Sequence, residues 1–195
     1  MRNTLLHGRL TGALPSEKVL ILFDYMTLHG EEHYEEDVTQ MQHGLQAAFQ
    51  AREAGQEAAL VTAALFHDIG HIMADDPVHK NNPTVENDDH EKLAADLLKD
   101  FFPRQVTDPI LLHVVAKRYL CTVNPDYYES LSDASQKSFH LQGGKMTDAQ
   151  VANFEKHPHY KGAVLLRTWD DKAKEIHWEV PGLDTYTELV LSAML

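Results

Sequence analysis

The stretch His67-Asp68-Ile69-Gly70-His71 decides how this chain is interpreted, because it lies inside the apolar helical segment Ala58–Met73. Burying an imidazole and a carboxylate without partners costs on the order of several kcal/mol. A bound metal ion would offset this cost. The stretch therefore predicts a metal site inside a helical core.

The rest of the chain has the same helical character. Apolar residues recur at helical spacing almost throughout, whereas the alternation typical of strands is scarce, so an all-α fold is predicted. The stretches Gly30–Glu36 and Ala74–Asp89 are expected to be loops, and Ser16 is expected to cap the first helix. The expected helices cover about Glu17–Leu28, Val38–Ala54, Glu57–Met73, His90–Phe101, Asp108–Arg118, Ala134–His140, Thr147–Glu155, Tyr160–Lys174 and Leu183–Met194.

Length and composition predict one compact domain over residues 1–195, because 195 residues with 43% hydrophobic content can bury one sizeable core. The net charge of −13 argues against nucleic acid or an anionic membrane as a partner. The single Cys121 excludes an intramolecular disulfide. No signal peptide or membrane-spanning segment is recognised, so a cytoplasmic protein is expected.

The thirteen histidines fall into two groups. Those in polar loops or near the ends of the chain are interpreted as solvated, namely His7, His29, His79, His157 and His159. Four others lie in helical context, namely His43, His67, His90 and His113. Each of the four taken alone fits a satisfied core histidine better than a ligand. As a set with Asp68 and Asp170 they favour a metal site, and a donor set without thiolates suits iron, manganese or zinc.

The order His43, His67-Asp68 and Asp170 resembles the signature of the HD-domain superfamily, all-α metal-dependent proteins best known as phosphohydrolases. With His90 and His113 between them, the pattern resembles the six-ligand version that holds two metals. This resemblance implies an HD-domain helical bundle with a di-metal site in its core.

Four stretches, together with Arg167 and Asp170, make the resemblance more specific. They resemble the mixed-valent di-iron oxygenases of phosphonate catabolism, a family that acts on 2-amino-1-hydroxyethylphosphonate and on its trimethylammonio analogue. The resemblance extends from about Glu31 to Lys174. The stretches are Val38–Gln46, His67–His71, His113–Cys121 and Leu141–Gly144.

This resemblance implies two iron ions, Fe(II) and Fe(III), with dioxygen as co-substrate. One iron would be held by His43, His67, Asp68 and Asp170. The other would be held by His90 and His113 with Asp68 shared, which leaves positions open for a chelating substrate. Independently of the family, Asp68 is the natural bridge, because a carboxylate has two oxygens and this one neighbours a ligand histidine.

Two cations are candidates for binding the phosphonate. Lys117 lies four residues after His113 on the same helix face, so it can offer a cation to an anion at the metals; the alternative is a surface lysine. Arg167 lies three residues before Asp170, and its guanidinium could take phosphonate oxygens in bidentate fashion. The alternative is an ion pair with Asp170 or Asp171.

His71 and Ser135 are further candidates for substrate contact. His71 lies four residues after His67 and faces the same pocket; the family implies a substrate contact, and the alternative is a hydrogen bond that orients a ligand. Ser135 matches a family position near the phosphonate. Its alternative is a helix cap beside Ala134.

The segment His33-Tyr34-Glu35-Glu36 departs from the family pattern, which places a gating tyrosine three residues before the glutamate. Here that position is His33 and the tyrosine is Tyr34. Glu36 matches the glutamate that meets the substrate's amino group, and Tyr34 is a candidate aromatic contact for a quaternary ammonium. The alternative for both is a solvated loop.

The predicted function is therefore oxidative cleavage of the carbon–phosphorus bond of 1-hydroxy-2-(trimethylammonio)ethylphosphonate or 2-amino-1-hydroxyethylphosphonate, giving phosphate and glycine betaine or glycine. His71, Lys117 and Arg167 are the predicted catalytic side chains beside the metals. A two-metal HD phosphohydrolase acting on a nucleotide or small phosphate ester is the alternative, since the same ligands can activate water. A third hypothesis is a catalytically silent, metal-stabilised domain that senses a phosphorylated metabolite.

Overall fold

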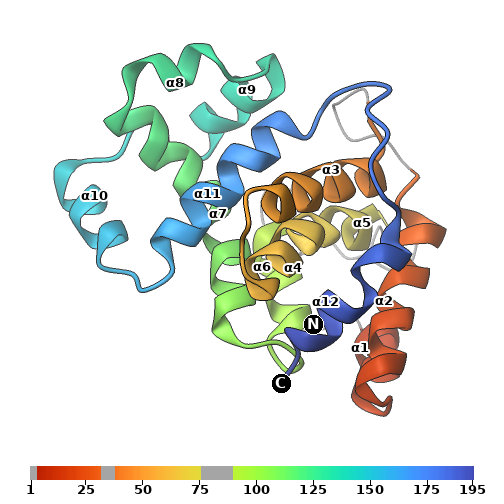
Figure 1. Ribbon diagram of the computed structural model, residues 1–195. Helices are drawn as coiled ribbons and strands as arrows, with labels where there is room; N and C mark the ends of the chain where they lie inside the picture. The colour runs from red at the N-terminus through yellow and green to blue at the C-terminus, as the bar shows by residue number, and fades with distance from the viewer. Residues whose placement is uncertain (1–3, 32–37, 76–89) are drawn as a thin grey trace.

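The computed structural model describes residues 4–31, 38–75 and 90–195 (Figure 1). Within these ranges every regular element is helical, as predicted. None of these helices is long and apolar enough to cross a membrane. The elements are α1 (Thr4–Thr11), α2 (Pro15–His29), α3 (Gln40–Glu53), α4 (Ala58–Phe66), α5 (Ile69–Asp75), α6 (His90–Leu98), α7 (Arg104–Val123), α8 (Pro125–Glu129), α9 (Asp133–Leu141), α10 (Asp148–Glu155), α11 (Tyr160–Lys172), the 3₁₀ helix η2 (Leu183–Tyr186) and α12 (Thr187–Ser192).

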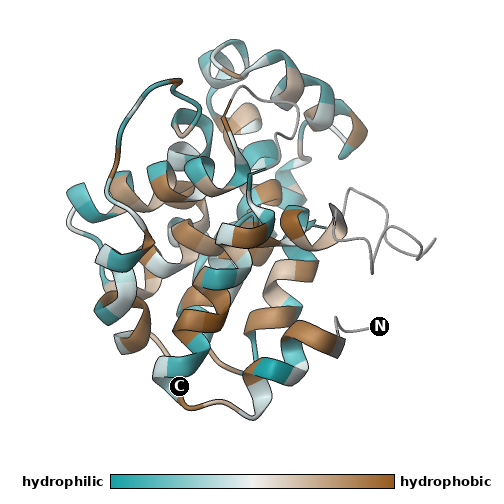
Figure 2. Cartoon of the chain, turned by 90° about the vertical axis from the view of Figure 1, so that its right-hand side faces the viewer, coloured by the Kyte–Doolittle hydropathy of each residue, from teal (hydrophilic) through white to brown (hydrophobic). Residues whose placement is uncertain are grey.

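The helices pack around one large hydrophobic core. The long helix α7 packs against α4, α6 and α11, while α3 packs against α4 and α11. Figure 2 shows apolar stretches gathered on the helices in the middle of the molecule. Two smaller clusters join α7 to α10 and α11 through Phe154, and α7 to α8 and α9 through Phe139. The segment α8–α10 therefore rests on the second half of α7.

Two glycines allow close contacts between the helices that carry or flank the candidate metal ligands, α3 with α4 and α5 with α6. A Cβ on Gly44 of α3 would lie 2.7 Å from the carbonyl oxygen of Leu65 in α4. A Cβ on Gly70 of α5 would lie 1.9 Å from the carbonyl oxygen of His90. Both distances are too short for any side chain, so only glycine allows these contacts.

The predicted helix Glu57–Met73 is wrong in one respect, because it is interrupted at His67 and Asp68. Helix α4 ends at Phe66 and α5 begins at Ile69. The His67 ring Nδ1 lies 2.9 Å from the carbonyl oxygen of Ala64, the group that an unbroken helix would pair with the Asp68 N–H. The interruption frees both side chains to point into the interior.

Several other helix predictions are corrected. Leu14, not Ser16, is the N-cap of α2, with Pro15 in the first turn and the Glu17 carboxylate accepting from the Leu14 N–H. Helices α1 and α8 were not predicted, and α7 extends beyond the predicted Asp108–Arg118 at both ends. The first and last turns of a helix lack the full apolar periodicity from which helices are predicted, so boundaries are the weakest part of such predictions.

His7 is also corrected. Its ring Nε2 lies 2.9 Å from Asp100 and its side chain is only 16% exposed, so it is not a solvated group. The predicted loops Gly30–Glu36 and Ala74–Asp89, with His79, lie largely outside the described residues.

Candidate metal centre

Six side chains converge where α3, α6, α7 and α11 meet the link between α4 and α5. All are buried except Asp68, whose side chain is 15% exposed, and all except His67 line a pocket of about 110 Å³. They are His43 of α3, His67 and Asp68 of the link, His90 of α6, His113 of α7 and Asp170 of α11. These are the six ligands predicted from the sequence.

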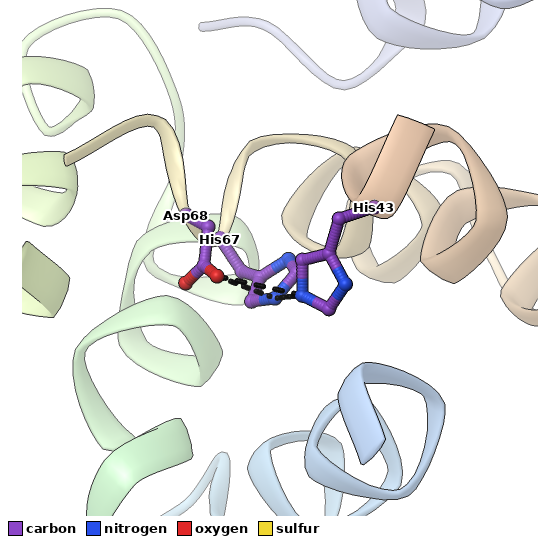
Figure 3. A group of neighbouring side chains, drawn as sticks. All are labelled: His43, His67 and Asp68. Carbon is purple, nitrogen blue, oxygen red and sulfur yellow. Dashed lines mark hydrogen bonds and ion pairs between the residues drawn. The ribbon is translucent and has the colours of Figure 1, made fainter. Parts of the chain in front are cut away.

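The first group consists of His43, His67, Asp68 and Asp170. The Nε2 atoms of His43 and His67 lie 3.2 Å apart, and His43 Nε2 lies 3.4 Å from Asp68 Oδ2 (Figure 3). Asp170 Oδ1 closes the group at 3.2 Å from His43 Nε2 and 3.8 Å from His67 Nε2. The four donor atoms thus face one small volume.

The second group uses the other oxygen of Asp68. Asp68 Oδ1 lies 3.5 Å from His90 Nε2 and 3.6 Å from His113 Nε2, and these two nitrogens lie 3.2 Å apart. Asp68 therefore presents Oδ2 to one group and Oδ1 to the other. Since the second group has three donor atoms against four in the first, it leaves more room for a ligand.

Backbone carbonyls orient three of the imidazole rings. The Nδ1 atoms of His43 and His113 lie 2.7 Å from the carbonyl oxygens of Ala173 and Ile110, and His67 Nδ1 contacts Ala64 as described above. A neutral ring that donates from Nδ1 carries a lone pair on Nε2. All three lone pairs then point into the cluster, as metal ligation requires.

The charge of the cluster also fits a cation. Burial disfavours the charged form of His43, but hydrogen bonds with Asp170 and Asp68 outweigh it and raise its pKa to about 10. Burial lowers the pKa of His113 to about 4 and that of His90 well below its usual value, so these two rings are neutral. Without a metal ion, a proton on His43 thus faces the carboxylates of Asp68 and Asp170, and a bound cation would take the place of that proton.

The residues present fit a pair of metal ions. Two donors on one ion with bonds of about 2.1 Å lie roughly 3.0–3.4 Å apart, close to most of the distances above. Asp68 Oδ1 is buried and has no hydrogen-bond partner, although it lies beside two histidines. A metal between Asp68, His90 and His113 would satisfy that oxygen, and the donor set suits iron, manganese or zinc.

Cationic and hydroxyl groups line another part of the pocket, which we call its cationic end: Lys117, Ser135, Ser138, Arg167 and Lys174. Lys117 of α7 is 3% exposed, and its Nζ donates to Ser138 Oγ of α9 at 2.6 Å. Burial, together with the nearby Arg167, lowers the pKa of Lys117 to about 8. Lys174, just after α11, donates to Ser135 Oγ at 3.4 Å. This arrangement suits an anion with several oxygens.

Arg167 contacts the metal-ligand candidate Asp170 as well as groups at the cationic end of the pocket. It forms the ion pairs that were considered as the alternative, with NH1 2.8 Å from Asp170 Oδ2 and NH2 donating to Asp171. NH2 also donates to Ser135 Oγ at 3.3 Å and Nε to the Tyr127 hydroxyl at 3.4 Å. Of its five N–H groups, one on NH1 is left by these contacts, so the guanidinium holds Asp170 while offering little of its fork to an anion.

The remaining candidates divide into those that the structure describes and those that it does not. The His71 ring stacks on His90 with centroids 3.8 Å apart and lines the pocket. Ser135 is not the cap of α9, because Ser132 accepts from the Ser135 N–H. Instead, Ser135 is buried beside Arg167. His33, Tyr34 and Glu36 lie outside the described residues.

Several pocket residues were missed by the sequence analysis. They are Gln40, Ser138, Gln142 and Lys174, all of which line the pocket. Ser138 lies three residues after Ser135 on α9, a spacing that places both on one helix face and could have indicated it. Nothing in the local pattern distinguishes Gln40 or Lys174, because their place in the pocket depends on contacts between distant helices.

Comparison with known proteins identifies the family. The HD domain matches residues 41–121, which include five of the six ligand candidates. Hydroxymethylphosphonate dioxygenase of Gimesia maris is 49% identical over 180 residues, 92% of this chain and 90% of that protein.

The [1-hydroxy-2-(trimethylamino)ethyl]phosphonate dioxygenase (glycine-betaine-forming) of Leisingera caerulea is 41% identical over 151 residues, 77% of this chain and 76% of that protein. The predicted resemblance, all-α HD fold and dioxygenase class are thereby confirmed. The chain belongs to the HD-domain family of phosphonate dioxygenases.

Proposed function

We propose that the protein is a di-iron dioxygenase that cleaves the carbon–phosphorus bond of a small 1-hydroxyphosphonate. The observation that carries this proposal is Asp68, whose two oxygens face two separate groups of histidines next to a cationic pocket. One dioxygen and one 1-hydroxyphosphonate balance as one carboxylic acid and one phosphate. The carbon is oxidised and dioxygen is reduced, so no further reductant is needed.

Two irons fit the proposed ligands. His43, His67, Asp68 and Asp170 would hold one, and His90, His113 and the second oxygen of Asp68 the other. When bound, a ferrous–ferric pair supplies the binding and one-electron reduction of dioxygen, which no protein side chain provides. The smaller ligand number of the second position supports its use by a chelating substrate.

The protein residues bind and orient the phosphonate. Lys117 is a buried ammonium that donates to the neutral Ser138 hydroxyl, so an anionic phosphonate oxygen would give it a charged partner. Ser135 and Lys174 offer further donors at the same end. This positive charge also neutralises the phosphate that forms when the bond to carbon breaks. Arg167 acts mainly by fixing Asp170.

The pocket also offers a neutral wall for the group attached to the hydroxylated carbon. Among the described residues this wall includes Val38, Gln40, Val114 and Ala134. This wall and the 49% identity to the hydroxymethylphosphonate enzyme support a hydrogen at that position. Tyr34 and Glu36, which precede Val38, are our candidates for binding an amino or trimethylammonio group.

The test is phosphate release from three substrates under air and under a nitrogen atmosphere: hydroxymethylphosphonate, 2-amino-1-hydroxyethylphosphonate and its trimethylammonio analogue. We expect strict dioxygen dependence with at least one of them. Anaerobic hydrolysis of a phosphate ester would instead indicate the phosphohydrolase, and tight phosphonate binding without turnover would indicate a sensing domain.

Metal analysis and electron paramagnetic resonance test the cofactor separately. We expect about two irons per chain and the signal of a coupled ferrous–ferric pair after partial oxidation. An active protein with a single zinc would refute the oxygenase mechanism.

A further inference from the structure

Gln40 brings a hydrogen-bond acceptor without a partner to the wall of the pocket. It is the first residue of α3, its side chain is 8% exposed, and it lines the pocket. In the described parts of the chain, Gln40 Oε1 is fully buried and receives no hydrogen bond. Leaving an amide carbonyl buried in this way is unfavourable. The position therefore indicates a donor that arrives with a ligand.

The position of Gln40 in α3 places it near the metal ligands. It lies three residues before His43, a spacing that puts both side chains on one face of the helix. The cations that suit a phosphonate come from other elements, namely α7 for Lys117 and the end of α11 for Lys174. Gln40 therefore adds to this pocket a neutral amide from the helix that carries His43.

The chemistry of the substrate class limits what Gln40 can meet. A fully ionised phosphonate carries acceptors alone, so it has no hydrogen to offer to a carbonyl oxygen. Every 1-hydroxyphosphonate carries a hydroxyl on the carbon beside phosphorus. That hydroxyl is the donor that all the proposed substrates share.

We propose that Gln40 Oε1 accepts a hydrogen bond from this hydroxyl and so selects 1-hydroxyphosphonates over phosphonates that lack the group. The inference rests on the proposed function, because it takes the ligand class from it. Gln142 Oε1 also lacks a partner and lines the pocket, but Gln142 is only half-buried and follows α9, at the end where Lys117 and Ser138 meet. Gln40 is therefore the residue assigned to the hydroxyl.

The experiment measures ligand binding without turnover. The iron-loaded protein is titrated anaerobically by calorimetry with hydroxymethylphosphonate, methylphosphonate and 2-aminoethylphosphonate. We expect Gln40→Met to raise the dissociation constant of hydroxymethylphosphonate by roughly threefold to tenfold, the effect of one hydrogen bond. The dissociation constant of methylphosphonate, which has the same phosphonate but no hydroxyl, should change by less than about twofold. The ratio of the two dissociation constants is the readout.

Gln42→Met is the matched control. Gln42 is exposed on the same turn of α3 and accepts from the Thr39 N–H at 3.2 Å, so its loss loosens the start of the helix without touching the pocket. It should leave the ratio unchanged. Gln40→Glu keeps an oxygen at the same distance along the side chain but adds a negative charge. It should therefore lower the affinity for both phosphonate anions while the preference for the hydroxyl is retained.

Three results would overturn the inference. Equal losses with hydroxymethylphosphonate and methylphosphonate in Gln40→Met would mean that Gln40 only shapes the wall. A loss confined to 2-aminoethylphosphonate would make Gln40 an acceptor for ammonium. Unchanged dissociation constants for both ligands, in a folded variant with normal iron content, would mean that the hydroxyl does not make this contact. If the wild type binds no hydroxyphosphonate, the proposed function fails instead.

Discussion

Lys117→Met should change substrate affinity and protein stability in opposite directions. Lys117 is 3% exposed and donates to a neutral hydroxyl, so in the protein without phosphonate its charge is held in a poorly solvated place. Methionine has similar length and no charge. The substitution therefore removes the charge with little change in packing.

The stability gain follows from the pKa. Burial first, and then the nearby Arg167, lowers the pKa of Lys117 from 10.5 to about 8, which corresponds to roughly 3 kcal/mol against folding at pH 7. Losing the bond to Ser138 costs about 1 kcal/mol. We expect Lys117→Met to be more stable by about 1–2 kcal/mol at pH 7, seen as a Tm about 2–8 °C higher.

The pH dependence has a definite sign. At pH 7 the lysine is charged in both the folded and unfolded states, so the full cost is present. Between about pH 8 and pH 10.5 the folded protein releases this proton before the unfolded chain does, so the wild type gains stability as the pH rises. The difference between wild type and variant should therefore shrink over this range.

The effect on the phosphonate is larger and unfavourable. Removing one partner of a buried, charge-assisted hydrogen bond costs about 2–5 kcal/mol, which weakens binding by roughly thirtyfold or more. Anaerobic calorimetry with hydroxymethylphosphonate and thermal unfolding without it measure the two effects. Lys161→Met, on the exposed face of α11, is the control for loss of a lysine. A destabilised variant with unchanged phosphonate affinity would refute the reasoning.

Three further experiments test how the site is assembled. Asp68→Ala should empty both metal positions and His113→Ala mainly one, as measured by metal analysis; equal partial losses would contradict a bridging role for Asp68. Gly70→Ala should destabilise the protein by about 1–3 kcal/mol and lower the metal content at the His90 position, because the new Cβ would meet the His90 carbonyl. The control is Gly8→Ala, which has open space around it and should change neither stability nor metal content in the same assays. Gln46→Leu removes two hydrogen bonds to the backbone of Glu175, at 2.8 and 3.1 Å, so we expect the free energy of unfolding to fall by about 1–3 kcal/mol in denaturant unfolding. We also expect weaker metal retention, because the nearby Ala173 carbonyl orients His43. A destabilised variant that keeps all its metal would separate the two effects.

The six ligand candidates and the helical class follow from the sequence by itself. Helical periodicity is a local property, so the apolar faces can be found without the fold. The chemistry of imidazole and carboxylate side chains restricts which residues can share a metal. The residues that meet this restriction in helical context are His43, His67, Asp68, His90, His113 and Asp170. The family resemblance rests on the same residues and on the stretch from His113 to Cys121.

The tertiary structure decided what each polar group meets. The break between α4 and α5 turns the two oxygens of Asp68 toward different histidine pairs, and the close approach at Gly44 and Gly70 brings those pairs together. The burial of Gln40 and the arrival of Lys174 depend on segments far apart in the chain. Sequence spacing describes one helix face at a time, whereas burial, hydrogen-bond partners and pKa depend on which faces pack against one another.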